Sequence, residues 1–183
     1  MTTERDATPA DGYHVRLMRD ADLAELADID RRADRLFLET GIPEVVAMVS
    51  GPPVCPADFK PMLSACTVHV ACTADDRPVG LAAWQRLVDD IYVRLLAVDP
   101  DHGRRGLGSA LLRSTILEGR RISARRCALS TFREVSFNQP FYTRHGFREL
   151  PLSLASDALR LRFEAEIPEE ARPEQRVLMV LDL

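Results

Sequence analysis

The chain has 183 residues, of which 46% are hydrophobic, and a formal net charge of −4 at pH 7. This length fits one domain that buries roughly 70% of the surface of its unfolded chain. The acidic balance argues against a nucleic-acid binder, because such proteins depend on positive charge. No apolar run approaches the roughly 20 residues that cross a bilayer, and the polar first twelve residues lack the apolar segment of a signal peptide. We therefore expect a cytoplasmic protein without nucleic-acid or membrane partners.

The cysteines show neither a metal-binding nor a disulfide pattern. None belongs to a CxxC pair, and none stands beside a histidine at metal-ligand spacing. In a domain large enough for its own core, such cysteines are typical of reduced, mostly buried thiols, so we expect no metal. The four are Cys55, Cys66, Cys72 and Cys127.

The first third of the chain predicts a strand, a helix and a loop-rich connection. Residues 1–11 are expected to form a flexible tail, and the alternating residues 13–19 predict a strand. Asp20 can cap a helix that continues to about residue 40. Five prolines and two glycines make 41–61 a loop-rich connection of the kind that shapes binding surfaces, with a short helical stretch near 45–49. In the helix predicted over residues 20–40, the residues near one face are Leu23, Leu26, Ala27, Asp30, Ala33, Leu36 and Phe37.

The middle of the chain predicts three consecutive strands. Residues 66–73 and 79–88 flank a turn and predict a hairpin. Residues 90–100 predict a further strand that is central and ends deep in the core, since its second face becomes apolar only at Leu96 and Val98. The first face of that strand is wholly apolar and consists of Ile91, Val93, Leu95 and Ala97.

The last part of the chain alternates irregularly between helices and strands. A proline in the first turn and a glycine stop, Pro140 and Gly146, mark one of its helices. The fold class is therefore α/β or α+β, with a mixed sheet. The predicted elements are a helix over 106–120, a strand over 124–132, a helix over 138–147, a helix over 156–166 and a closing strand over 176–183.

The stretch HGRRGLGSALL, residues 102–112, has the geometry of a phosphate-binding turn. A strand, a glycine turn and a helix N-terminus leave free backbone N–H groups that favour an anion. Gly106 and Gly108 allow close approach of the backbone, and Arg104 and Arg105 can add charge-assisted contacts. The stretch is neither a Walker loop nor the GxGxxG dinucleotide turn, since it lacks GK[ST] and a glycine at position 111. The alternative is a surface turn with solvated arginines.

Two motifs in order resemble the GCN5-related N-acetyltransferase (GNAT) superfamily. VRLLAVDPDHGRRGLGSALL, residues 93–112, resembles the strand, loop and helix that hold acetyl-CoA there, with the loop pattern [QR]-x-x-G-x-[GA]. Its first position falls on Gly103, where the family prefers Gln or Arg, so Arg104 or Arg105 would have to substitute. NQPFYTRHGF, residues 138–147, resembles the later family element that ends in Y-x-x-x-G-F.

The resemblance implies a fold, a reaction and a set of site residues. The fold is a single GNAT domain over 12–183, with a mixed, mostly antiparallel sheet, flanking helices and a splayed central strand pair. The reaction is direct transfer of an acetyl group from acetyl-CoA to a primary amine. Tyr142 would protonate the leaving thiolate, since a phenol has a reference pKa of about 10, although an ordinary core aromatic is the alternative. The residues implied to bind the co-substrate are Leu96, Val98, Gly103, Arg104, Arg105, Gly106, Leu107, Gly108, Ser109 and Asn138.

The sequence does not identify the base that would take the proton of the attacking amine. Many relatives place a glutamate on the strand before the loop, but positions 92–95 here hold no carboxylate. Asp89 and Asp90 stand at the start of that strand, which is too far from the thioester. Arg94 is either a solvent-facing strand residue or a ligand for an acidic group on the acceptor.

Three further features are weaker candidates near the acceptor. His69 in mid-strand is more often structural than catalytic, and Glu39 at the end of the first helix can be a surface charge. The acid-rich segment 164–174 could attract a cationic acceptor or simply be solvated. His102 and His145 flank the two motifs and are expected at the surface.

The sequence also does not identify the acceptor substrate or the oligomeric state. The acceptor can be a small amine, an amino acid, an antibiotic amine, or a protein lysine or N-terminus, and the protein can be a monomer or a homodimer. A non-catalytic acyl-CoA-binding regulator on the same fold is the main alternative to an enzyme. A nucleic-acid binder that uses residues 102–112 and 120–126 is disfavoured by the acidic charge and the lack of interleaved aromatic residues.

Overall fold

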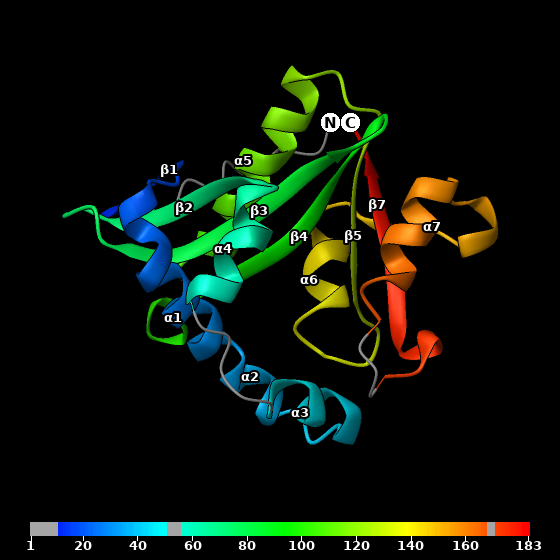
Figure 1. Ribbon diagram of the computed structural model, residues 1–183, viewed down its shortest axis with the longest axis horizontal. Coiled ribbons are helices and arrows are strands. Elements are labelled where there is room, and N and C mark those ends of the chain that lie inside the picture. The colour runs from blue at the N-terminus through cyan, green and yellow to red at the C-terminus, as the bar shows by residue number, and fades with distance from the viewer. Residues whose placement is uncertain (1–10, 51–55, 168–170) are drawn as a thin grey trace.

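Figure 1 shows the computed structural model of the protein, which describes residues 11–50, 56–167 and 171–183. The predicted tail therefore lies outside the described residues, apart from Asp11, and so does Cys55. Among the described residues, no helix is both long enough and apolar enough to cross a membrane.

The described strands form one sheet in the order β1-β2-β3-β4-β5-β7-β6. Within it β4 and β5 run parallel, and every other neighbouring pair is antiparallel. This confirms the predicted mixed, mostly antiparallel sheet. The strands are β1 (Tyr13–Leu17), β2 (Thr67–Thr73), β3 (Pro78–Leu87), β4 (Asp90–Val98), β5 (Arg126–Phe132), β6 (Arg148–Glu149) and β7 (Arg176–Asp182).

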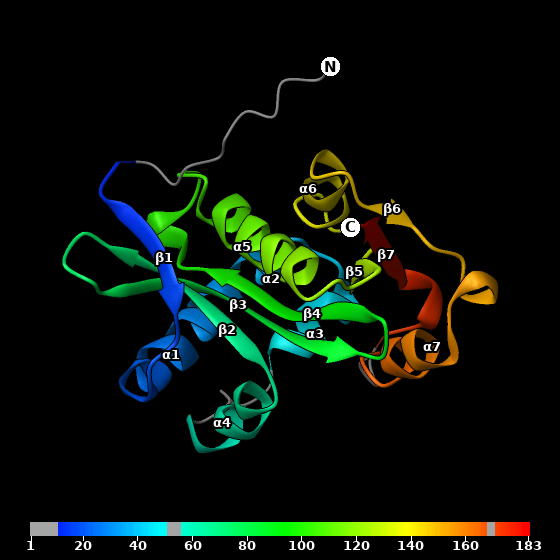
Figure 2. The same ribbon diagram turned by 90° about the horizontal axis from the view of Figure 1, so that it is seen from above.

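Helices cover both faces of the sheet. Figure 2 shows α5 (Leu107–Arg121) and α6 (Gln139–Arg144) on one face, and α1 (Leu23–Ala33), α4 (Pro56–Ser64) and α7 (Asp157–Glu164) on the other. In Figure 1, α2 (Arg35–Leu38) and α3 (Pro43–Val49) continue from α1 along the lower edge towards β5 and β7. Short 3₁₀ turns lie at Asp20–Asp22, Pro100–His102, Leu152–Leu154 and Pro173–Gln175.

The two central strands part after a short contact. β4 and β5 pair over three residues, from Ile91 with Cys127 to Val93 with Leu129. Figure 1 shows them diverging from this shared end, β4 towards α1 and β5 towards the loop before α6. The predicted splayed central pair is therefore present.

An extra residue in β4 changes which face its side chains take. Ala83 of β3 lies opposite Leu95, but the next residue, Trp84, lies opposite Val93, so Arg94 has no partner of its own. A β-bulge of this kind bends the strand and inverts the alternation of all later side chains. Arg94 and Leu95 consequently share one face of the sheet.

The bulge overturns two expectations for this strand. The predicted single apolar face is wrong, because Ile91 and Val93 pack with α5 and α6 whereas Leu95 and Ala97 pack with α1 and α4. The prediction that the strand ends deep in the core is also wrong. Residues 90–93 are buried, but Arg94, Leu95, Leu96 and Val98 are only partly buried, because β5 has already left their side.

Two predicted segments differ from the structure for physical reasons. The helix expected over 20–40 breaks at Asp34, where the chain turns so that Phe37 packs against Phe132 and Phe137, with ring centroids 6.4 and 5.3 Å apart. Helix α4 begins inside the stretch 41–61 that was expected to be loop-rich. Burial of Phe59 and Leu63 stabilises this helix by more than its prolines destabilise it. The two-residue strand β6 was not predicted.

Candidate functional site

The loop between β4 and α5 is held in place from its first residue. Asp99 accepts a 3.0 Å hydrogen bond from the N–H of Asp101 and a 2.9 Å bond from Arg32 of α1. At Gly103 a Cβ atom would lie 3.0 Å from the carbonyl oxygen of Pro100. The absence of a side chain at this position, unusual for the resembled motif, thus has a structural cause.

The N-terminus of α5 offers an anion-binding arrangement. Gly106 takes a left-handed conformation with φ of 74°, as L residues rarely do, and opens the helix. The N–H of Ala110 is the first to bond back, to the carbonyl of Gly106 at 2.9 Å. The N–H groups of residues 107–109 therefore have no intrahelical acceptor, while the side chain of Leu107 is buried and anchors the turn.

The two loop arginines are held differently. Arg105 donates a 2.6 Å hydrogen bond to the hydroxyl of Tyr13, which is itself 2.9 Å from Nδ1 of His102. Arg104 is exposed, takes a left-handed backbone conformation with φ of 57°, and contacts no polar group among the described residues. Arg104 is thus the arginine whose side chain is free to meet an anion at this helix end.

The second motif lies directly against the first. Ser109 Oγ lies 2.9 Å from Nε2 of His145, the residue that ends α6. A Cβ at Gly108 would lie 3.5 Å from the ring of Phe141. The expectation that His145 lies at the surface is wrong: it is half-buried, 4.7 Å from the Phe141 ring, and burial together with Arg144 and Arg113 lowers its pKa.

The later part of β4 exposes backbone groups towards the opening. Asp99 bonds through its N–H to Val79 of β3 at 2.9 Å. Since hydrogen-bonded and non-hydrogen-bonded pairs alternate along an antiparallel ladder, the N–H and C=O groups of Leu96 and Val98 point away from β3. β5 does not pair with them, so these groups are available to a ligand between the strands.

Asn138 precedes the first residue of α6, and Tyr142 lies within this helix. The Tyr142 ring makes edge contacts with Phe141 and Phe147, at 5.1 and 5.8 Å between centroids. Burial raises the pKa of the Tyr142 phenol, whose hydroxyl makes no hydrogen bond to the described residues. Asn138 begins the helix but its side chain does not cap it, so both polar groups are unengaged within the described chain.

The residues considered as bases in the sequence lie in three separate parts of the fold. His69 is buried beneath α5, where burial lowers its pKa, and it belongs to the core. Asp90 forms a buried 3.1 Å ion pair with Arg126 at the far end of β4, so it is remote from the opening as expected. Glu39 lines a cavity of about 520 Å³ together with Glu134, near the ends of α2 and β5.

Asp30 and Asp34 form an acidic pair that is not among the sequence-predicted site residues. Ile29 and Ala33 of α1 pack into the cluster that contains Leu95, whereas Phe37 of α2 packs on β5. The turn that carries the two aspartates therefore crosses the interval where β4 and β5 part. Burial raises the pKa of Asp30 to about 7, with Asp34 contributing, and burial also raises the pKa of Asp34.

The sequence contained an indication of this pair. Asp30 stands on the apolar face of its helix among Leu26, Ala27 and Ala33. A carboxylate on such a face is expected to lose hydration and to gain proton affinity. The apolar pattern of the helix does not by itself distinguish this position from its neighbours.

Arg94 is not solvent-facing. Its Nε donates a 3.0 Å hydrogen bond to Oε1 of Glu166, and its NH1 lies 3.4 Å from the amide oxygen of Gln85. Glu166 comes from the acid-rich segment 164–174, which thus supplies a carboxylate at the strand opening as well as surface charge. This contact, across 72 residues, could not be read from spacing.

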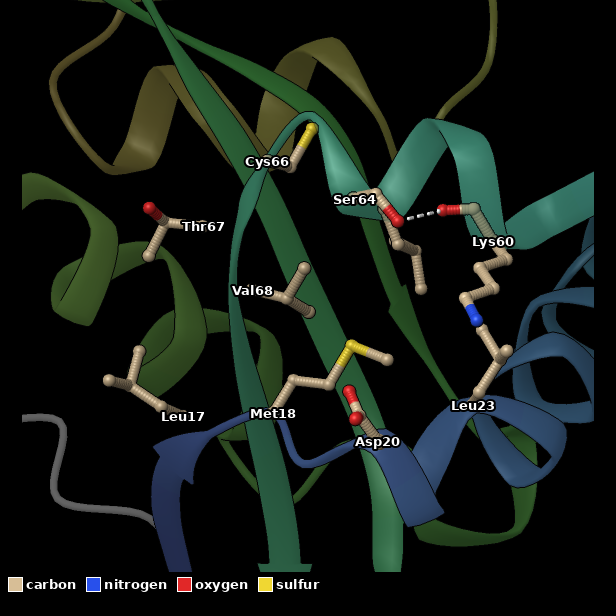
Figure 3. Close-up of a pocket in the computed structure, with 10 residues that line it drawn as sticks. Leu17, Met18, Asp20, Leu23, Lys60, Ser64, Cys66, Thr67 and Val68 are labelled. Carbon is tan, nitrogen blue, oxygen red and sulfur yellow. Dashed lines mark hydrogen bonds between the residues drawn. The ribbon is translucent and has the colours of Figure 1, made fainter.

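Two other groups of residues lie away from the motifs. Figure 3 shows a cavity of about 370 Å³ between the end of β1, the start of β2 and α4, where the Lys60 side chain extends towards Leu23. His14, Cys72 and Asp76 have ligand atoms within 4.8 Å of one another. Asp76 is already bonded to Arg16 and Arg19, so this group is an ion-pair network rather than a vacant cation site.

Comparison with known families decides the class of the domain. Residues 64–149 match the model of the acetyltransferase (GNAT) domain. The chain contains a GNAT domain. The matched range includes both stretches that predicted the family, the loop at 102–112 and the element at 138–147, so the resemblance is confirmed.

Relatives of this GNAT domain include acetyltransferases of known structure. The bS18-alanine N-acetyltransferase of Salmonella typhimurium is 33% identical over 82 residues, which cover 39% of this chain and 55% of the relative. The chain thus matches about half the length of that protein. The PaiA N-acetyltransferase of Thermoplasma acidophilum, solved with coenzyme A, is 13% identical, with a TM-score of 0.68 over 93% of this chain and 99% of the other. The ribosomal-protein-S18-alanine N-acetyltransferase of Escherichia coli is 18% identical, with a TM-score of 0.65 over 93% of each chain. The solved structures establish the shared fold.

Proposed function

We propose that this protein is an N-acetyltransferase that transfers an acetyl group from acetyl-CoA to a primary amine by direct attack. The observation that carries the proposal is the meeting of the two motifs: the open N-terminus of α5 and the C-terminal end of α6 are joined by the Ser109–His145 contact. This arrangement lies on the side of the sheet where the strands part and leave the backbone of Leu96 and Val98 unpaired. The residues of the loop from Gly103 to Ser109 would hold the pyrophosphate, and Asn138 the pantetheine arm.

Tyr142 is suited to act as the general acid. When an amine nitrogen forms a bond to the acetyl carbon, the carbon–sulfur bond breaks and a thiolate leaves. A phenol whose pKa burial has raised keeps its proton until the thiolate can take it. The resulting phenolate recovers its proton from solvent.

Asp30 is suited to act as the general base. It lies on α1, on the face of the sheet opposite α5 and α6, so an amine that enters from that side meets a base there and the acid on the other side. A carboxylate with a pKa near 7 can take the amine proton at neutral pH. The negative charge of Asp34, one turn further on, also raises the pKa of Asp30.

An acceptor screen tests the proposal. Purified protein with acetyl-CoA is given small amines, amino acids, aminoglycosides and peptides, and the release of free thiol is followed. We expect release only when acetyl-CoA and a suitable amine are both present. Tight CoA binding with no turnover of any amine, together with an unaltered Tyr142→Phe variant, would instead identify a non-catalytic acyl-CoA-binding protein. A burst of thiol without acceptor, traced to an acetylated cysteine, would refute direct attack.

A further inference from the structure

A charged cluster bridges β4 and β5 at the point where they part. Arg94 and Ser130 follow the last β4–β5 pair, Val93 with Leu129, on the two strands. Both side chains bond the same carboxylate: Arg94 Nε to Oε1 of Glu166 and Ser130 Oγ to Oε2, each at 3.0 Å. Glu166 therefore ties the strands together across their opening.

The Glu166 carboxylate has no remaining capacity for a ligand. The hydroxyl of Tyr92 donates a 2.6 Å bond to Oε2, and Arg162 donates bonds of 2.9 and 3.2 Å to Oε1. With the bonds from Arg94 and Ser130, these donors occupy the roughly four lone-pair positions of a carboxylate. Glu166 holds the cluster together and is neither a free base nor an acceptor for an amine.

The cluster has more positive than negative charge. Arg94, Arg162 and Arg176 surround this one carboxylate, and the described residues contribute no second carboxylate within bonding distance of them. Arg176 donates one bond, to Ser130, and stacks on Phe132 with its guanidinium carbon 4.6 Å from the ring centroid. The Nε of Arg176 is buried without a hydrogen-bond partner among the described residues. A buried, unpaired donor on a charged group is costly, so the positive charge of Arg176 is incompletely compensated by the described residues.

The cluster faces the side from which an acceptor would enter. Tyr92 packs in the apolar cluster beneath α7, on the face of the sheet opposite α5 and α6. The phosphate-binding end of α5 lies on the other face, so this positive charge does not serve the co-substrate. Arg94 and Arg162 keep 19% and 20% of their side-chain surface exposed, which leaves them accessible to a small ligand.

We propose that Arg94, Arg162 and Arg176 bind the carboxylate of the amine acceptor, which makes the acceptor class a free amino acid or a similar small amino carboxylate. This inference rests on the proposed function. Guanidinium groups match a carboxylate with paired, charge-assisted hydrogen bonds, and in a partly desolvated site such bonds discriminate strongly against a neutral analogue. A peptide N-terminus or a protein lysine offers these arginines no carboxylate next to its amine.

The experiment compares matched ligands that differ in one charge. CoA-saturated protein is titrated by calorimetry with each of the twenty amino acids and with the corresponding α-amides. We expect at least one amino acid to bind on the order of 10-fold or more tighter than its amide, as for a charge-assisted hydrogen bond. If no amino acid binds more tightly than its amide, the inference is overturned.

Variants of the cluster test whether these arginines cause the preference for a carboxylate over an amide. Arg176→Met should reduce the preference for carboxylate over amide by on the order of 10-fold, and Arg176→Lys should restore part of it. Arg162→Gln provides a second test if Arg176→Met does not fold, which thermal unfolding will show. Arg160→Gln is the matched control, because Arg160 lies on the same helix and pairs with the exposed Asp157. An unchanged preference in the folded cluster variants would overturn the assignment.

Turnover separates this inference from the proposed function. If carboxylate-bearing amines bind selectively but no thiol is released with acetyl-CoA, the transferase proposal fails and the carboxylate site stands. If amines are acetylated but amino acids and their amides are equivalent in binding and in kcat/KM, the transferase stands and the carboxylate site fails.

Discussion

Ser109 in the first turn of α5 and His145 at the end of α6 lie 2.9 Å apart, from Ser109 Oγ to His145 Nε2. They belong to two sequence motifs separated by a strand and a loop. Their contact fixes the distance between the helix end suited to phosphate and the helix that carries Tyr142. Together with the packing of Phe141 against Gly108, this polar contact positions Tyr142 relative to the N-terminus of α5.

This contact is expected to be measurable in the free energy of unfolding. Ser109→Ala and His145→Ala should show a coupling energy of about 1 kcal/mol in a double-mutant cycle by urea denaturation, the usual net value of a hydrogen bond. Ser114→Ala, on the same helix and without a hydrogen bond to the described residues, should show no coupling to His145→Ala. Strict additivity of Ser109→Ala and His145→Ala would contradict the structure.

Removal of the loop arginines is expected to weaken CoA binding. Arg104→Ala plus Arg105→Ala should raise the Kd for CoA by about 5- to 30-fold, since each exposed charge-assisted contact contributes about 1 kcal/mol. The effect should shrink as salt concentration rises. Calorimetry at two ionic strengths measures it, with the remote, exposed Arg148→Ala as control. An unchanged affinity would show that the loop does not bind the pyrophosphate.

Tyr142→Phe is expected to slow the chemical step and leave the fold intact. Its hydroxyl makes no hydrogen bond among the described residues, so its loss should change the free energy of unfolding little. General acid catalysis typically contributes 10²- to 10⁴-fold, and a kcat reduced by at least about 10-fold with unchanged Kd for CoA is the expected result. Equal kcat in the variant and the parent would remove Tyr142 from the mechanism.

The pH dependence of kcat should report Asp30. With a pKa of about 7, the Asp30 carboxylate is increasingly deprotonated as pH rises through neutrality, so kcat should rise there and then level off. Asp30→Asn should abolish that rise and lower kcat, whereas Asp28→Asn, exposed on the same helix, should leave it in place. A parent-like profile in Asp30→Asn would assign proton removal to another group.

The same pKa predicts an effect on stability. The folded pKa of Asp30 lies above the value of about 3.9 for an unfolded aspartate. Between the two values the folded state binds more protons, so the free energy of unfolding falls as pH rises from about 4 to 7. Asp30→Asn should therefore be more stable than the parent at pH 8, with the difference vanishing near pH 4. Urea unfolding at both pH values checks this, and a difference independent of pH would contradict the burial of Asp30.

The sequence predicts the elements that depend on local pattern. The hairpin of β2 and β3, the helix that begins at Gly106 and the glycine stop at Gly146 all follow from turn and capping preferences. The bulge at Arg94 and the break at Asp34 are decided by partners in other strands and helices. No single-strand or single-helix pattern contains that information.

The proposed acceptor site was harder to predict than the proposed co-substrate site for a related reason. Gly103 to Ser109 form one continuous segment with a recurrent pattern. Asp30, Arg94 and Glu166 come from three distant segments that the fold brings to the same face. Their chemistry depends on burial and pairing, which spacing along the chain does not encode.

The one-residue bulge in β4 determines which face of the sheet each later side chain of the strand lines. Beyond Arg94, the side chains of Leu95 and Ala97 turn towards α1, and those of Leu96 and Val98 towards α5. Under the proposed function, substitutions at alternate positions should therefore change recognition of the amine or of acetyl-CoA separately. Deletion of one residue at the bulge would exchange the two sets of side chains between the faces, so the lining of both faces depends on the number of residues in this strand.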